Sequence, residues 1–346
     1  MMDFYRGKRV LVTGHTGFKG TWLCRILVEA GAQVTGISLG GEERPFYERA
    51  GLTQLIHDVR ADIRDYNTLL TQFRLCKPEI VFHLAAQPLV RESYADPRRT
   101  YETNVMGTVN ILECIRRTDT VKSAVIVTTD KVYRNREQER AFREDDILDG
   151  FDPYSNSKSC AELVTATYRR SYLNLPPIST ARAGNVIGGG DFAKDRIIPD
   201  CIRAVTKGEP IKVRNPHSVR PYQHVLEPLF AYLLIAEKQW DNPALAGCYN
   251  IGPEECDCIT TGELVSLFCE KWGEGASWID EGEKDAPHEA GLLRLDCAQM
   301  QATFGWRPRW NIDAAIAQTV LFSRVWMNGC DVKAEMDREI QEYLCC

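Results

Sequence analysis

Four consecutive polar residues follow an apolar run in which every residue suits a buried strand. The run occupies residues 124–127, and Thr128, Thr129, Asp130 and Lys131 come directly after it. Open α/β sheets bind their ligands at the carboxyl ends of the strands, so an acid next to an amine at this point could be the acid and base of an active site. The other interpretation is a solvated turn.

A second pair of residues could take part in proton transfer. Tyr154 and Lys158 stand four positions apart, which places both side chains on one face of a helix. An ammonium group close to a phenol favours the phenolate and lowers a pKa that starts near ~10. Such a tyrosine can accept a proton from a hydroxyl while hydride leaves for a nicotinamide. The same spacing also occurs in ordinary helix pairs.

Glycines punctuate the start of the chain in a pattern typical of dinucleotide binding. Gly14, Gly17 and Gly20 lie between an expected strand at residues 8–14 and an expected helix at residues 20–31. Glycine there permits a tight turn and a close approach of the backbone to a pyrophosphate, which faces the helix N-terminus. We therefore expect a dinucleotide cofactor at this turn.

The sequence leaves the choice between NAD and NADP open. An acidic residue that would hold the ribose 2′-hydroxyl is missing from the end of the second strand, where Ser38 stands and Glu42 and Glu43 follow later. Asp62 and Ile63 come after the third strand and could reach an adenine. An equally good interpretation of Asp62 is a helix-capping residue.

Strands and helices alternate regularly through the first half of the chain. Expected strands at residues 32–39, 79–86, 123–129 and 177–188 are near-continuously apolar, and amphipathic helices are expected between them. This pattern predicts an α/β fold with a doubly wound parallel sheet. Residues 1–190 are predicted to form the cofactor-binding domain, with the catalytic tyrosine and lysine. Residues 191–346 are predicted to form mainly a smaller substrate-binding lobe, interleaved with the first domain.

Composition excludes several other classes of protein. The chain has 346 residues, a formal net charge of −6 and a pI near 5.7, which argue against nucleic-acid binding. No stretch has the ~20 apolar residues of a membrane span, and no secretory signal is evident. The 13 cysteines are scattered without paired metal-ligand spacing, so we expect reduced thiols, no metal site and a cytoplasmic location.

Taken together, these motifs resemble the extended short-chain dehydrogenase/reductase family. The resemblance rests on the glycine turn, "HLAAQ" at residues 83–87, Thr129 and the Tyr154–Lys158 pair, and it runs through nearly the whole chain. More narrowly, "VTGHTGFKGTWL", "TTDKVY", "FDPYSNSK" and "RAGNVIGGGDFAKDRIIPD" resemble CDP-D-glucose 4,6-dehydratases. The resemblance implies a Rossmann-type fold with a smaller C-terminal lobe, and a redox-neutral dehydration of a nucleotide sugar on tightly held NAD.

The resemblance also implies which residues bind each ligand. The expected cofactor contacts are Gly14, Thr16, Gly17, Phe18, Gly20, Asp62, Ile63, Leu84, Ala85, Ala86, Thr103, Tyr154 and Lys158. The expected contacts with the substrate diphosphate are Asn185, Arg196, Arg214 and Arg220. Guanidinium groups suit bidentate phosphate binding.

Family chemistry implies a role for each polar residue at the strand end. Tyr154, tuned by Lys158, removes the proton of the sugar 4-hydroxyl, and Thr129 hydrogen-bonds the same oxygen. Asp130 protonates the departing C6 hydroxyl. Lys131 stands where better-known dehydratases carry glutamate. The resemblance to CDP-glucose dehydratases includes this position, because they similarly carry lysine there. Lys131 is either the base for the C5 proton or, if it stays charged, an electrostatic stabiliser of the enolate.

Some features leave alternatives open. Residues 134–150 depart from the aromatic and glycine-rich loop of the subfamily; we favour an exposed surface loop, the alternative being a changed sugar or a changed lid. Family likeness implies a homodimer, or a dimer of dimers, through the helices beginning near Asn104 and Tyr154. The alternative functions are a dehydratase or epimerase for another nucleotide sugar, and a non-catalytic NAD-binding protein.

Overall fold

A central parallel sheet organises the chain. The computed structural model describes residues 1–39, 44–282 and 291–346. In these residues the sheet has seven strands in the order β11-β6-β5-β4-β1-β2-β3, and every neighbouring pair is parallel. The strands are β1 (Arg9–Thr13), β2 (Gln33–Ser38), β3 (His57–Arg60), β4 (Ile80–His83), β5 (Ser123–Val127), β6 (Ile178–Ala183) and β11 (Cys248–Ile251). The order reverses direction between β1 and β4, where such sheets bind ligands.

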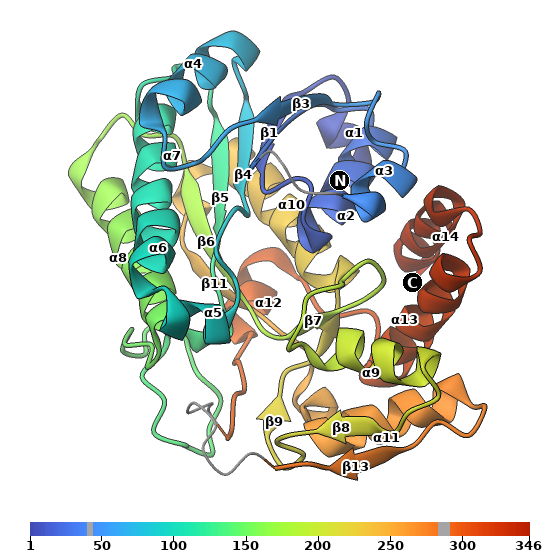
Figure 1. The fold of residues 1–346 in the computed structure, drawn as a ribbon. Helices are drawn as coiled ribbons and strands as arrows, with labels where there is room; N and C mark the ends of the chain where they lie inside the picture. The colour runs from blue at the N-terminus through green and yellow to red at the C-terminus, as the bar shows by residue number, and fades with distance from the viewer. Residues whose placement is uncertain (40–43, 283–290) are drawn as a thin grey trace.

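Helices cover both faces of the sheet, as the alternating pattern predicted. α4 (Tyr66–Cys76), α7 (Gly107–Arg116) and α8 (Pro153–Ser171) lie on one side, and α2 (Phe18–Glu29) and α10 (Leu226–Asp241) lie on the other (Figure 1). All residues of β4 and β5 are buried. This burial explains their unbroken apolar sequences, since strands covered on both faces have no solvent side.

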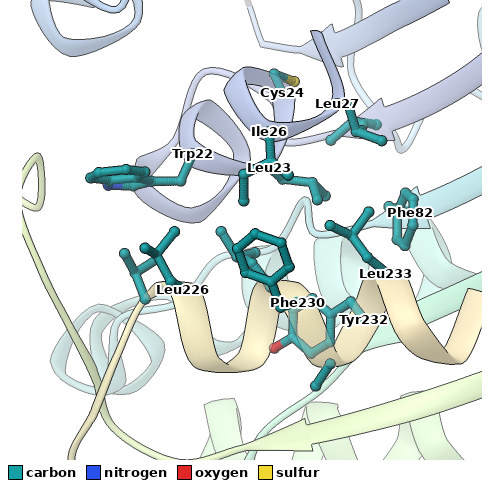
Figure 2. Packing of buried hydrophobic residues seen from close by; sticks show 14 of the residues in the cluster. Trp22, Leu23, Cys24, Ile26, Leu27, Phe82, Leu226, Phe230, Tyr232 and Leu233 are labelled. Atoms are coloured by element: carbon teal, nitrogen blue, oxygen red, sulfur yellow. The ribbon is translucent and has the colours of Figure 1, made fainter. Parts of the chain in front are cut away.

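α2 packs against α10 within the largest buried hydrophobic cluster among the described residues. Trp22, Leu23 and Ile26 face Leu226 and Phe230 across the interface, and none of the five is more than 3% exposed (Figure 2). Burying each such side chain stabilises the fold by roughly 1.5–3 kcal/mol. The Trp22 indole also donates to the Gly189 carbonyl over 2.8 Å, which ties α2 to the loop that leaves the sheet.

A second lobe lies beyond the carboxyl ends of the strands, with its own core. It contains α9 (Ile197–Thr206), β8 (Ile211–Val213), α11 (Thr261–Trp272) and β13 (Trp278–Asp280), and α13 (Ile312–Met327) packs against it (Figure 1). The C-terminal helix α14 (Val332–Cys345) returns to α2 through an ion pair between Arg25 and Asp337. The remaining elements are α1 (Met2–Tyr5), α3 (Pro45–Arg49), α5 (Val90–Ala95), α6 (Pro97–Tyr101), η1 (Glu102–Met106), η2 (Asp130–Val132), β7 (Val186–Ile187), β9 (Val219–Arg220), β10 (Gln223–His224), η3 (Pro243–Leu245), η4 (Glu255–Asp257), β12 (Ile259–Thr260) and α12 (Ala298–Phe304).

Residues after 190 contribute to both lobes. α10 covers the central sheet and β11 pairs with β6 at its edge, although both follow the exit to the second lobe. The helix expected to begin near Asn104 has a π-helical first turn, η1, which precedes α7. Within it the side-chain amide of Asn104 accepts from the backbone N–H of Gln87. It also donates to the backbone carbonyl of Gln87 and to the Ser157 hydroxyl.

The loop at residues 134–150 is only partly the exposed loop that we favoured. Most of its charged side chains are exposed, but Phe142 is 2% exposed and stacks on Tyr133. Phe142 also exchanges backbone hydrogen bonds with residues 294 and 296. The loop therefore joins the first lobe to the chain segment that follows residue 291. Among the residues described, no helix is long and apolar enough to cross a membrane.

Candidate active site

A cavity of about 1120 Å³ opens over the carboxyl ends of the strands and extends to the second lobe. Its size exceeds the roughly 300–1,000 Å³ of a typical small-ligand pocket, so it has room for two nucleotide-sized ligands. All of the site residues predicted from the sequence line this cavity, with the single exception of Asp130. Residues from the ends of β1, β3, β4, β5 and β6, from η1 and α8, and from the second lobe are thereby brought to one place.

The glycine turn lies at the floor of the cavity, and its geometry requires glycine. Gly14 has a φ of +74°, and a Cβ there would lie 2.8 Å from the Ala85 amide nitrogen. A Cβ on Gly20 would lie 2.0 Å from the Gly14 carbonyl oxygen, which is a steric overlap. α2 begins at Phe18, so its first amide groups face the turn. The cradle fits the pyrophosphate of a dinucleotide.

The end of β2 presents a hydroxyl in place of the missing acid. Ser38 Oγ lies 3.0 Å from His15 Nδ1, whose other ring nitrogen lies 3.0 Å from Asp58 Oδ1. Burial lowers the pKa of His15, although Asp58 opposes the shift. Beside them the Arg44 guanidinium donates to the Thr16 hydroxyl over 2.7 Å. The nearest described carboxylate, Asp58, is thus already engaged by His15.

Asp62 and Ile63 line the same end of the cavity. The Asp62 carboxylate pairs with Arg64, and this hydrogen bond is the main cause of its lowered pKa. The alternative interpretation of Asp62 as a helix cap is wrong, because Asp65 caps α4 by accepting from the Thr68 amide. Glu42 and Glu43 lie outside the described residues.

A buried histidine holds the loop that follows β4. His83 Nδ1 lies 2.7 Å from the Thr13 hydroxyl and Nε2 lies 3.2 Å from the Thr108 hydroxyl. Burial lowers the pKa of His83 to about 3, so the ring is neutral and structural. Thr13 Oγ1 also accepts from the Ala85 amide, which positions the loop along the cavity wall.

Tyr154 enters the cavity from the first turn of α8. Asp152 caps this helix by accepting from the Ser155 amide over 3.0 Å. Burial raises the pKa of Tyr154 to about 12, and a hydrogen bond with Thr129 opposes the rise. Among charged groups the largest influences on Tyr154 are Asp130, Arg196 and Asp152. Lys158 is not one of them, which differs from the expected tuning of the phenol.

Lys158 lies one turn further along α8, and its environment explains this difference. Its ammonium group donates to the Val127 carbonyl at the end of β5 over 3.1 Å, and the side chain is buried. Burial lowers the pKa of Lys158 to about 8, and Glu162 opposes the shift. The ammonium is therefore bound to the strand end, and its charge is lost as pH rises through about 8.

The polar cluster after β5 forms one hydrogen-bonded unit. Asp130 Oδ1 accepts from the Thr129 hydroxyl over 2.9 Å and from the Lys131 ammonium over 3.1 Å. Lys131 also donates to Asn185 Oδ1 over 3.2 Å. The Asp130 side chain is 1% exposed and that of Lys131 is 26% exposed. Lys131 and Thr129 therefore face the cavity, and Asp130 lies behind them.

The predicted diphosphate contacts lie on the side of the second lobe. Arg196 pairs with the buried Asp191 over 2.9 Å, and Arg214 pairs with Asp195 over 2.8 Å. Arg220 is buried and donates to the carbonyl of Val219. Their guanidinium groups are oriented by these partners while the residues still line the cavity.

Lys19 lines the cavity but is absent from the residues predicted above. It is the second residue of α2 and stands inside the glycine turn. Burial, followed by the charges of Arg196 and Lys158, lowers the pKa of Lys19 to about 7. Among the described residues we find no hydrogen-bond acceptor or ion-pair partner for its ammonium. A lysine beside a phosphate-binding turn is the sequence signal that could have identified it.

Comparison with known proteins agrees with this geometry. A family model described as GDP-mannose 4,6 dehydratase matches residues 11–319. The chain is 44% identical over 351 residues to a CDP-glucose 4,6-dehydratase of Salmonella typhimurium, covering 99% of this chain and 98% of the relative.

Solved structures give the same fold. A UDP-glucose 4-epimerase of Thermus thermophilus in complex with NAD is 27% identical, with a TM-score of 0.80 over 91% of this chain and 99% of that one. A dTDP-glucose 4,6-dehydratase of Bacillus anthracis in complex with NAD is 21% identical, with a TM-score of 0.77 over 91% and 96% of the two chains. The resemblance inferred from the sequence is confirmed, and the chain belongs to the GDP-mannose 4,6-dehydratase family of extended short-chain dehydrogenases/reductases.

Proposed function

We propose that the protein is a CDP-D-glucose 4,6-dehydratase that converts CDP-glucose into CDP-4-keto-6-deoxyglucose. The observation that carries this proposal is the 44% identity with the CDP-glucose 4,6-dehydratase of S. typhimurium over nearly the whole length of both chains. The Asp130–Lys131 pair at the cavity supports dehydration, because a 4-epimerase has little use for a second acid–base pair.

NAD is the cofactor of this proposal. The solved relatives from T. thermophilus and B. anthracis hold NAD, and the Gly14 and Gly20 cradle fits its pyrophosphate. The predicted cofactor contacts from Thr16 to Lys158 all line the cavity. When bound, NAD accepts hydride from C4 of the sugar and returns it to C6, so no reductant is consumed.

The side chains of this protein handle three protons. Tyr154 takes the proton of the 4-hydroxyl, and Thr129 hydrogen-bonds the same oxygen. The resulting 4-ketone acidifies the C5 proton; a base removes that proton and the C6 hydroxyl leaves as water. A proton returns to C5 when hydride is added at C6. Asp130 is the proposed acid that supplies the proton for this water; in the substrate-free site its Oδ1 accepts from the cavity-facing Thr129 and Lys131. Hydrogen bonds in a substrate-free site tighten when substrate binds, so a carboxyl one layer back can still serve as the acid.

Lys131 has two roles that the geometry supports equally. Its ammonium faces the cavity between Asp130 and Asn185, where it can stabilise the negative charge of the enolate. As a neutral amine it can instead accept the C5 proton, which in the first role must go to a base elsewhere in the site. Both roles place the same nitrogen beside the sugar.

Cations of the cavity wall bind the substrate diphosphate. Asn185, Arg196, Arg214 and Arg220 are the proposed contacts. Lys19 joins them because its ammonium forms no ion pair with a described residue, although the charge of Asp130 acts on it. An unpaired ammonium among other cations favours binding of an anion, which relieves their mutual repulsion.

A homodimer in the cytoplasm completes the proposal. Met106 on η1 and Leu163 on the adjoining α8 are 52% and 49% exposed, which supports a contact with a second copy through these helices. All 13 cysteines are free, as expected in a reducing compartment. Leu163→Glu should convert a dimer into a monomer, as measured by light scattering after size-exclusion chromatography.

The first experiment is incubation of the purified protein with CDP-, dTDP-, UDP- and GDP-glucose without added reductant, followed by mass spectrometry. Loss of one water from CDP-glucose alone is the expected result. Loss of water from another nucleotide sugar would keep the reaction and correct the substrate. An unchanged mass with a changed sugar configuration would identify an epimerase, and no reaction with NAD bound would contradict the enzymatic proposal.

A further inference from the structure

A buried ionic cluster lies directly behind the catalytic strand end, outside the cavity. Glu162 on α8 is its centre and accepts hydrogen bonds from three side chains. These donors are the Thr128 hydroxyl over 2.5 Å, the Thr180 hydroxyl over 2.7 Å and the Arg182 guanidinium over 2.9 Å. One carboxylate therefore joins α8 to both β5 and β6.

The cluster is almost completely shielded from water. The side chains of Glu162 and Arg182 are 2% and 3% exposed. A buried ion pair contributes little net stability, because removing two charges from water costs about as much as their attraction returns. Arg182 also donates to the Tyr133 hydroxyl over 2.8 Å, and Tyr133 in turn donates to Asn250 Oδ1. Such an extensive network suggests that the cluster has a further role.

The position of Glu162 connects it to two catalytic residues. Glu162 follows Lys158 by four positions on α8, so both residues share one face of the helix. Thr128, which donates to Glu162, immediately precedes Thr129 in the chain. Lys158 itself donates to the carbonyl of Val127, the residue before Thr128. The Glu162 carboxylate thus fixes the end of β5 relative to the helix turn that carries Lys158.

We infer that Glu162 is a positioning residue for catalysis, which locks α8 to the end of β5 and thereby fixes Lys158 against the Val127 carbonyl. Glu162 acts through Thr128 and Lys158 and has no place in the cavity lining. This inference rests on the role proposed for Tyr154 and on the role that the family resemblance implies for Lys158. It goes further by assigning a function to a residue that contacts neither ligand.

Other titratable groups face Glu162 and Lys158 from the surrounding elements. Those that interact electrostatically with one or the other are Lys19 on α2, His83 on β4, Tyr133 after η2, Arg182 on β6 and Cys248 on β11. Glu162 is the charged group that raises the pKa of Lys158 against burial. Without the Glu162 charge, its opposition to the lowering of the Lys158 pKa by burial is lost.

The sign of the expected pH effect follows from this arrangement. The family resemblance implies that Lys158 acts as an ammonium, and in that role activity falls as pH rises through its pKa, which lies at about 8. Without the Glu162 charge the pKa of Lys158 falls, and the alkaline loss of activity moves to lower pH by roughly one unit. A purely structural role would lower stability and leave the pH profile unchanged.

The test compares kcat against pH, with saturating substrate and NAD, for the wild type, Glu162→Gln, Glu162→Asp and Glu227→Gln. Glu227 is the matched control: it is fully buried in α10 and accepts from two backbone amides and the Tyr343 hydroxyl. We expect the alkaline limb to move to lower pH in Glu162→Gln only. Glu162→Asp keeps the charge and should keep the limb at the wild-type pH, with lower thermal stability.

Two outcomes would overturn the inference: a wild-type profile in Glu162→Gln, or an equal displacement in Glu227→Gln. If Glu162→Gln does not fold, the same measurement is made on the double variant Glu162→Gln/Arg182→Met. Removing both partners leaves neither charge of this pair alone in the core. Failure of the role proposed for Tyr154 would be recognised separately. In that case Tyr154→Phe would retain wild-type turnover, whatever the pH profiles of the Glu162 variants.

Discussion

Gly14→Ala is expected to weaken NAD binding more than any comparable glycine substitution that lies away from the cavity. Gly14 has a φ of +74°, where a residue with a Cβ is strained by roughly 1–2 kcal/mol. Alanine also restricts the unfolded chain, which returns about 0.4–1 kcal/mol. The new Cβ would lie 2.8 Å from the Ala85 nitrogen and 2.9 Å from its Cα, so the loop after β4 must move. Overpacking of this kind costs roughly 1–3 kcal/mol more.

Gly7 provides a matched control because its φ is +72° and no atom lies within 4 Å of the position of its Cβ. Gly7→Ala therefore carries the backbone strain alone, about 1 kcal/mol or less after the gain from the unfolded chain. Urea unfolding should find Gly14→Ala less stable than Gly7→Ala by at least about 1 kcal/mol.

Titration of the NAD-free protein with NAD should then show at least a tenfold weaker affinity for Gly14→Ala, equivalent to ~1.4 kcal/mol, and an unchanged affinity for Gly7→Ala. The affinity is measured without urea, at a temperature at which circular dichroism shows both variants to be folded. Equal stabilities and equal NAD affinities for the two variants would refute the assignment of the turn as a sterically closed cradle.

Three further substitutions test the proposed chemistry. Tyr154→Phe should abolish hydride transfer, followed by nicotinamide absorbance, while NAD stays bound; wild-type turnover would remove Tyr154 from its role. Asp130→Asn should still oxidise C4 but stall before water is lost, so rapid dehydration in a mass-spectrometric time course would contradict the acid assignment. Lys19→Met should weaken the binding of a diphosphate ligand about tenfold or more, whereas Lys207→Met, an exposed control, should not. A rise in the Kd of NAD alone would locate the contact on the cofactor, a rise in the KM of the sugar nucleotide would locate it on the substrate, and no change in either would refute the role.

Features that depend on local sequence were predictable. The strand that ends at Val127 is apolar on both faces, and the glycine turn must stand between a strand and a helix, so both could be assigned from residue type and spacing. The alternation of strands and helices predicted the parallel sheet for the same reason. Local patterns also brought the tyrosine and lysine of α8 onto one face.

Features that depend on tertiary contacts were not predictable. The position of Asp130 behind Lys131 follows from three side chains that meet in space, and residue type alone does not encode it. The role of Glu162 depends on partners from β5 and β6, and an acid within an amphipathic helix ordinarily faces water. Lys158 is bound by a backbone carbonyl, which has no signature in the sequence.

The late position of β11 in the chain has a consequence for folding. β6 (Ile178–Ala183) remains an edge strand with unpaired backbone groups until residues 248–251 have been synthesised. During translation the intervening chain of the second lobe emerges while this apolar edge is still open, a state in which strands pair with other molecules. Chains truncated before residue 248 should therefore aggregate, and chaperones that cover strand edges should bind the nascent chain in this interval.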